Sequence, residues 1–196
     1  MTATDGVIQG TADITVTDAI TTLEVRVSAS SDDAEEDVLG NMILNSSDLE
    51  LTLDSTDQTV GMRFNGIDIP PGATINNAYI QFQVEEAQSV ATVLTIQGED
   101  IGNAPPFTSS NGNISSRTKT GAAVGWAPNP WNAVGDAGTD QMTPDISPVI
   151  QEIVDLGGWL NGNSLVIIIT GTGKRVAESY NGVAGAAPLL HLEYIP

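Results

Sequence analysis

Short segments that alternate apolar and polar residues, separated by Gly, Pro, Asn and Asp, dominate this chain of 196 residues. The clearest is 78–84 (AYIQFQV), where Ile80, Phe82 and Val84 share one face and polar side chains share the other. A period of two is the pattern of a half-buried β-strand. The chain is long enough for one β domain with a substantial core. We therefore predict an all-β fold, with an N-terminal strand or linker segment at 1–22 and one domain at 23–196.

Further segments fit the same pattern. The predicted strands are 23–29, 49–53, 60–64, 78–84, 91–97, 165–170 and 189–194. Segment 91–97 follows 78–84 after a short acidic stretch, as a hairpin partner would, and 165–170 is apolar on both faces, as a fully covered central strand would be. One short helix is predicted at 144–156, with Thr143 as N-cap and Pro144 in the first turn. Residues 100–140 predict a long, partly irregular loop.

The charge is strongly one-sided: 25 acidic residues face 6 basic ones, for a net charge of −19. A nucleic acid partner needs a basic face, so it is disfavoured, and an anionic membrane surface is disfavoured for the same reason. The chain has no cysteine, which excludes disulfides, a thiol nucleophile and a zinc–thiolate site. No segment is apolar enough for a transmembrane helix, and the first residues show no signal-peptide pattern.

The densest charge is the run SSDDAEED at 30–37, with five carboxylates within six residues. Packed carboxylates repel one another unless they are solvated or share a cation, and their hard oxygens suit Ca²⁺. The run is therefore either a solvated loop or part of a calcium site. The metal ligands predicted here are Asp32, Asp33, Glu35 and Glu36, with Glu99 and Asp100, or Glu85 and Glu86, completing the shell.

Three tryptophans offer surfaces on which a sugar could stack. Trp126 and Trp131 lie in the long loop beside Pro128 and Pro130, which would hold the rings outward; the alternative is that both rings cover the edge of the core. Trp159, next to the predicted helix end, is expected to be buried.

A polar segment after the central strand adds Arg175, Glu178 and Tyr180 as candidate ligand-binding residues. Arg175 is also a candidate structural partner of a buried carboxylate, Glu85 or Glu178. Nothing singles out a catalytic pair, and the P-loop, G-x-S-x-G and H-E-x-x-H patterns are missing.

From about residue 23 to 194 the chain resembles a family of bacterial exported domains, the DNRLRE-type and related carbohydrate-binding jelly rolls. The similarity is carried by SSDDAEE at 30–36, VGMRF and IPPGATI at 60–75, AYIQFQVEE at 78–86, LTIQGED at 94–100, TPDISPVIQEIV at 143–154, GNSLVIIITGTGKRVAESYNG at 162–182 and APLLHLEY at 187–194. The resemblance implies a jelly-roll β-sandwich with a structural calcium near the start of the domain, at the position of Asp32, Asp33, Glu35 and Glu36.

Together these features predict a non-catalytic, extracellular or cell-surface binding module, calcium-stabilised, that attaches a secreted or surface protein to polysaccharide. The loop around Trp126 and Trp131 would bind the glycan. The alternative is a self-associating structural or adhesive subunit joined by exchange of its N-terminal strand. A polysaccharide-active enzyme is the least favoured class.

Overall fold

A computed structural model describes residues 19–196, so most of the N-terminal strand or linker segment predicted at 1–22 lies outside the described residues. The described chain is mostly β. Its strands are β1 (Thr21–Arg26), β2 (Asp33–Asp37), β3 (Met42–Ile43), β4 (Asp48–Glu50), β5 (Gln58–Phe64), β6 (Thr74–Gln81), β7 (Val84–Glu86), β8 (Val93–Gly98), β9 (Val124–Trp126), β10 (Leu165–Thr172), β11 (Val176–Glu178) and β12 (Leu189–Ile195). Its helices are a 3₁₀ turn, η1 (Thr139–Gln141), and α1 (Ser147–Val154).

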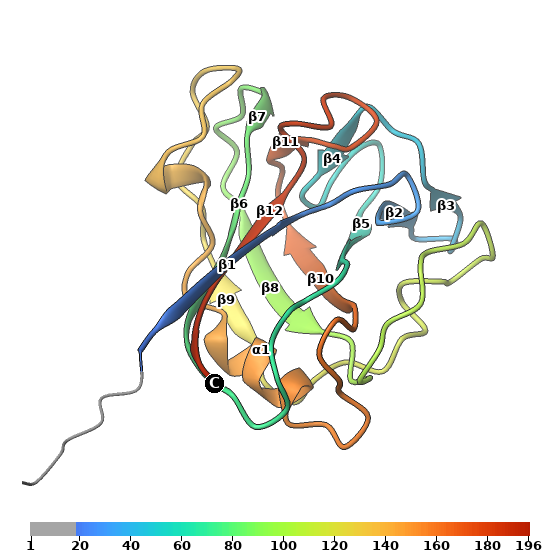
Figure 1. Ribbon diagram of the computed structural model, residues 1–196. Coiled ribbons are helices and arrows are strands. Elements are labelled where there is room, and N and C mark those ends of the chain that lie inside the picture. Colours follow the sequence, from blue (N-terminus) through green and yellow to red (C-terminus); the bar gives the residue numbers. More distant parts are fainter. Residues whose placement is uncertain (1–18) are drawn as a thin grey trace, which may run out of the picture.

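The strands form three antiparallel groups (Figure 1). A six-stranded sheet has the order β3-β2-β5-β10-β8-β9, and two three-stranded sheets have the orders β1-β12-β6 and β4-β11-β7. The main core lies between the six-stranded sheet and the β1-β12-β6 sheet, where apolar side chains of β5, β8 and β10 meet those of β6, β12 and α1. The chain is therefore β-sandwich-like.

Strand β10 is the centre of the six-stranded sheet, as the apolar run at 165–170 predicts. Ile167 and Ile169 point into the main core, while Val166 and Ile168 join a second cluster under the 104–114 loop with Phe107. Gly61 on the neighbouring strand admits this loop, because a Cβ there would lie 2.5 Å from the Phe107 ring. Both faces of β10 are thus covered, which confirms the prediction.

The predicted helix exists but begins later than expected. α1 starts at Ser147, with Pro148 in its first turn, so this proline rather than Pro144 has the position that suits the ring. Thr143 does not cap the helix. It pairs with the outer edge of β6, where its Oγ1 accepts the Ile80 amide at 3.0 Å and its amide donates to the Ile80 carbonyl. No helix in residues 19–196 is long and apolar enough to span a membrane.

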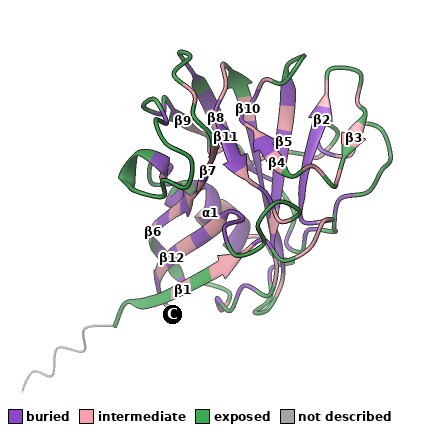
Figure 2. Ribbon diagram, turned by 90° about the horizontal axis from the view of Figure 1, so that it is seen from above, coloured by how far each residue is buried: buried purple, intermediate pink, exposed green. Residues whose placement is uncertain are grey.

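One prediction about pairing is wrong. The segment 91–97 is not the hairpin partner of 78–84, because β8 pairs with β10 and β9 while β6 pairs with β12. Of the two alternatives for the acidic run, the solvated loop does not fit: residues 30–32 form a turn, but 33–37 form β2, an interior strand of the six-stranded sheet, and most of it is buried (Figure 2). A strand of DAEED forms here because each buried carboxylate finds its own partner, as described below.

Candidate functional site

The carboxylates of the acidic run do not converge on one point. Asp32 forms an ion pair with Arg63 at 2.8 Å and also accepts the Asn65 side-chain amide. Glu36 accepts the amides of Ile114 and Ser115 at 2.7 and 2.8 Å, on the opposite side of the sheet from Glu35. These charges are satisfied locally, so the structure does not bring the carboxylates of the run together around one point.

The two acids predicted to complete the calcium shell also lie elsewhere. Glu99 forms an ion pair with Arg117, and Asp100 is exposed in a bend after β8. Asp33 accepts the Tyr180 amide at 2.7 Å, and its burial, helped by the neighbouring charge of Asp32, raises its pKa from 3.8 to about 6. Of these six predicted metal ligands, only Glu35 belongs to the cluster of acids that the structure builds.

That cluster lies on the β4-β11-β7 sheet. Three carboxylates, Asp48 of β4 with Glu85 and Glu86 of β7, place oxygens within 4.8 Å of one another. Three more adjoin them and share their electrostatic field: Glu35 from β2, Glu50 from β4 and Glu178 from β11. We call these six residues the acidic cluster.

A β-bulge brings the β7 side chains to the cluster. Val176 pairs with Glu86 and Ala177 with Val84, so Glu85 is an extra residue on β7 with no partner on β11. A bulge of this kind re-aims side chains and recurs beside functional sites. The middle strand β11 lies between β4 and β7, and at this position it carries only the small side chain of Ala177.

The acidic cluster has little positive charge near it. Among residues 19–196, the one salt bridge to a member is Lys174 Nζ to Glu86 Oε2, at 3.7 Å. Arg175 comes next in the chain, and it was a candidate partner for Glu85 or Glu178. Instead its guanidinium donates to the carbonyls of Asn129, Val90, Lys174 and Pro128, and to the Thr92 hydroxyl. Arg175 is 1% exposed and structural, but the carboxylate pairing was wrong.

Three carboxyl groups of the acidic cluster have raised pKa values, because they are desolvated and their negative charges are not balanced by nearby cations. Burial, together with Glu50 and Asp48, raises the pKa of Glu35 from 4.5 to about 9. Burial and four neighbouring carboxylates raise the pKa of Glu85, and burial and Asp48 raise that of Glu178. Buried carboxylates without cationic partners keep their protons or bind a cation.

One atom points to a missing partner. Glu85 Oε2 is fully buried and accepts no hydrogen bond from any described residue. Buried polar atoms are nearly always satisfied, so this oxygen calls for a ligand. The donor set around it is made only of hard carboxylate oxygens, which fit Ca²⁺ and do not favour a soft metal. Asp48, Glu85 and Glu86 could therefore hold a divalent cation.

The tryptophans take the second of the two roles considered. Trp126 and Trp131 are 6% and 1% exposed, and both pack against Phe82 in the core. Trp159 is buried as expected and donates its Nε1–H to the Ile69 carbonyl. The prolines therefore do not hold the two loop rings outward, and both indoles cover the edge of the core, as in the alternative. These rings expose no face on which a sugar could stack.

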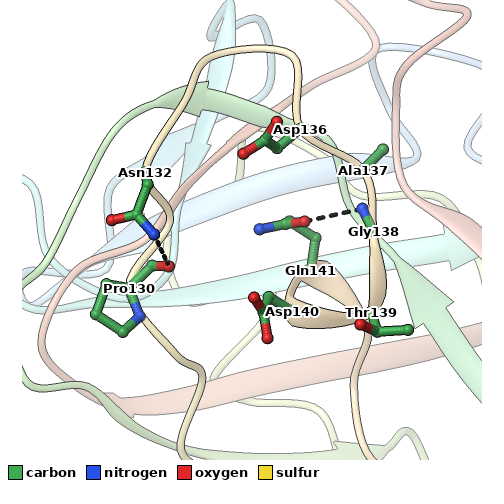
Figure 3. A pocket seen from close by; sticks show the side chains of 8 residues that line it. All are labelled: Pro130, Asn132, Asp136, Ala137, Gly138, Thr139, Asp140 and Gln141. Atoms are coloured by element: carbon green, nitrogen blue, oxygen red, sulfur yellow. Dashed lines mark hydrogen bonds between the residues drawn. The ribbon is translucent and has the colours of Figure 1, made fainter.

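The loop that carries Trp131 still forms a hollow. A cavity of about 250 Å³ lies between 130 and 141, lined by polar side chains that include Asn132, Asp136, Asp140 and Gln141 (Figure 3). The buried Trp131 holds this loop to the core by donating Nε1–H to the Asp140 carbonyl at 3.0 Å. Of the other predicted ligand residues, Glu178 belongs to the acidic cluster, and Tyr180 is half-buried against the core.

Sequence reasoning missed Asp48. Its signal was the alternation of 48–51 (DLEL), which sets Asp48 and Glu50 on one face opposite Leu49 and Leu51. Glu85 and Glu86 were considered only as completing a site elsewhere. Neither a scan against protein-family models nor a search of curated proteins matches this chain. The fold and the site therefore define an all-β, sandwich-like domain with an acidic cluster able to hold a cation.

Proposed function

We propose that this chain is a non-catalytic, calcium-stabilised binding module that attaches a secreted or cell-surface bacterial protein to polysaccharide. The observation that carries the calcium part is Glu85 Oε2, a buried carboxylate oxygen without a partner inside a cluster of six acids. The similarity to DNRLRE-type jelly rolls supports the same class, and it makes the jelly roll the proposed topology for these strands.

Calcium would act by neutralising charge. Asp48, Glu85 and Glu86 would hold it, and each would contribute carboxylate oxygens. The three short strands of this sheet come from separated parts of the chain, so a cation shared between β4 and β7 would tie residues 48–50 to 84–86. Without it, repulsion among the six acids opposes the pairing of these strands.

The hollow at 130–141 supports the binding part. Its lining is made of amide, carboxylate and hydroxyl groups, which suit a ligand rich in hydroxyls. The buried Trp131 below it and the clamp of Arg175 on the carbonyls of Pro128 and Asn129 hold the loop in one conformation. A preorganised loop loses less entropy on binding.

An enzymatic use of the acidic pair Glu35 and Glu50 is the competing class, since paired carboxylates with a raised pKa are what glycoside hydrolases use. Glu35 is 1% exposed, and it lies beneath β4, where its Oε1 accepts the Glu50 amide. A glycosidic bond does not reach a carboxyl so placed. This favours a binding module over an enzyme.

The calcium part is tested by thermal unfolding of the chelator-treated chain with and without millimolar calcium. We expect the melting temperature to rise with calcium, and Glu85→Gln to remove most of that rise. Asp100→Asn is the control, because it also replaces a carboxylate by its amide, but at an exposed position outside the acidic cluster. An equal calcium effect in wild type and Glu85→Gln would refute the assigned site.

The binding part is tested by titrating neutral and acidic polysaccharides in calcium and comparing wild type with Asp136→Asn and Asn132→Ala. Both side chains line the hollow and are exposed, so the fold should tolerate both changes. We expect affinity to fall at least about tenfold in either variant, equivalent to roughly 1.4 kcal/mol. Release of new reducing ends by the wild type would instead show an enzyme.

A further inference from the structure

Strand β1 has an open edge. It pairs with β12 on one side, and in residues 19–196 no strand pairs with its other side. The opposite edge of the same sheet is covered, because residues 141–146 exchange backbone hydrogen bonds with β6. The edge strands of the other two sheets are only two or three residues long. At six residues, β1 is the longest open edge in the described chain.

The register shows which backbone groups are free. Val27 donates to the Pro188 carbonyl, so its N–H points toward β12. In an antiparallel pair these directions alternate along the strand. The N–H and C=O groups of Thr22, Glu24 and Arg26 therefore point away from β12, and they bond to no other described residue. Such a row of donors and acceptors is a template for another strand.

The side chains beside these groups carry opposite charges. Leu23 and Val25 pack against the core on the inner face, so Glu24 and Arg26 alternate to the outer face. There Glu24 is near His191, and the Arg26 guanidinium donates to the Ala187 carbonyl, which leaves its other N–H groups for a partner. β1 is exposed to half-buried along its length (Figure 2). A strand with acid and base two residues apart is complementary to itself when it is turned around.

We infer that β1 pairs with β1 of a second copy of this chain, antiparallel, across a two-fold axis at Val25. In this register each Glu24 lies opposite Arg26 of the other copy, and the free backbone groups of both residues are satisfied. Opposite charges in this arrangement stabilise a strand pair, and a two-fold interface uses the same patch twice. An axis at Glu24 would instead set the two Glu24 side chains against each other.

This pairing goes beyond the proposed binding function and does not depend on calcium. It joins two β1-β12-β6 sheets into one sheet of twice the width. Strand pairing alone buries little surface, so we expect a weak, concentration-dependent dimer. It also differs from an exchange of the first eighteen residues, because the contact is made by β1 itself.

A cysteine trap tests the register, since the chain has no cysteine of its own. In the full chain, Val25→Cys places the two new thiols at a non-hydrogen-bonded pair, where Cα atoms lie about 4.5 Å apart, a separation that a disulfide bridges. Thr22→Cys is the matched control: its two copies lie on opposite sides of the axis, roughly 20 Å apart at about 3.4 Å per residue. On mild oxidation we expect a disulfide-linked dimer from Val25→Cys and not from Thr22→Cys.

Charge exchange is the second test. Sedimentation of the full chain should show that Glu24→Arg weakens the dimer at least about tenfold, and that the double variant Glu24→Arg, Arg26→Glu restores it. A chain that stays monomeric at high concentration overturns the proposal. So does a trap that closes at Thr22→Cys, or at both sites equally, because the contact is then an exchange of the N-terminal segment or has no fixed register.

Discussion

The amide of Glu50 donates a 2.6 Å hydrogen bond to Oε1 of Glu35, and this contact sets the two carboxyl groups beside each other under the β4-β11-β7 sheet. The bond stabilises the carboxylate of Glu35, but burial and the charges of Glu50 and Asp48 outweigh it and raise the pKa of Glu35 to about 9. At neutral pH this pair holds a proton unless a cation bound nearby favours its ionised form. The protein's dependence on pH and on calcium should therefore be linked.

In chelator, the melting temperature should fall as pH rises from 6 to 9. Glu35 has an ordinary pKa of 4.5 and a folded pKa of about 9, so its contribution to stability is complete below 4.5 and is lost as pH rises toward 9. We expect a loss of roughly 5 °C or more across this range. Differential scanning calorimetry at fixed ionic strength measures it.

Calcium should flatten that dependence. A bound cation favours the ionised carboxylates, so the stabilisation by calcium should grow between pH 6 and 9 and protons should be released on binding. A pH profile that is the same with chelator and with calcium would argue against any link between the acidic cluster and the metal.

Replacing one carboxylate of the acidic cluster by an amide should raise the melting temperature without calcium and lower it with calcium. Without calcium, Asp48→Asn or Glu85→Gln removes one repelling charge, so the variant should melt above wild type. With calcium, the same variant lacks a ligand and should melt below wild type. A residue with a purely structural role would change both conditions in the same direction. Thermal unfolding with and without calcium distinguishes the two roles, and Asp100→Asn should change neither by a similar amount.

Asp32→Asn distinguishes a calcium site in the acidic cluster from one in the acidic run at 30–37. Asp32 is buried against Arg63, so losing its charge leaves the guanidinium without its partner, and we expect destabilisation of about 2–4 kcal/mol. The calcium-dependent gain in melting temperature should nevertheless be kept in full. Loss of that gain would return the site to the acidic run at 30–37.

Arg175→Met should be the most destabilising single change outside the apolar core. The guanidinium satisfies five acceptors from three segments, 90–92, 128–129 and 174. Methionine leaves the buried carbonyl of Pro128 and the part-buried carbonyls of Val90 and Asn129 without this donor. We expect a loss of about 3 kcal/mol or more in the free energy of unfolding, measured with urea. Lys174→Met, one residue earlier and partly exposed, is the control and should cost under about 1 kcal/mol.

The periodic parts of the chain were predictable, and the reason is local. Alternation located β12 and the second half of β6, although the predicted strand 78–84 is interrupted at 82–83 and ends at the start of β7. The uninterrupted apolar run identified β10 as central, and the predicted helix at 144–156 contains α1. The start of α1 was missed because Pro144 and Pro148 both suit a first turn. Only the pairing of Thr143 with β6 decides between them.

The candidate site was less predictable, because its geometry depends on strand order. DAEED is typical of a solvated segment, and only the folded chain supplies its buried carboxylates with partners. The backbone amides of Tyr180, Glu50 and Ile114 donate to Asp33, Glu35 and Glu36 in turn. The convergence of Asp48 with Glu85 requires that β11, over 90 residues further along the chain than Glu85, lies between β4 and β7. Nothing in the local spacing of these acids indicates that arrangement.

We propose that Asp48, Glu85 and Glu86 bind one divalent cation, and calorimetric titration of calcium into the chelator-treated full chain measures this binding. We expect saturable binding with one site per chain. Binding should be abolished in the double variant that carries Asp48→Asn and Glu85→Gln, and it should be kept in the single variant Asp32→Asn. Absence of saturable binding, or equal binding in all three proteins, would contradict it.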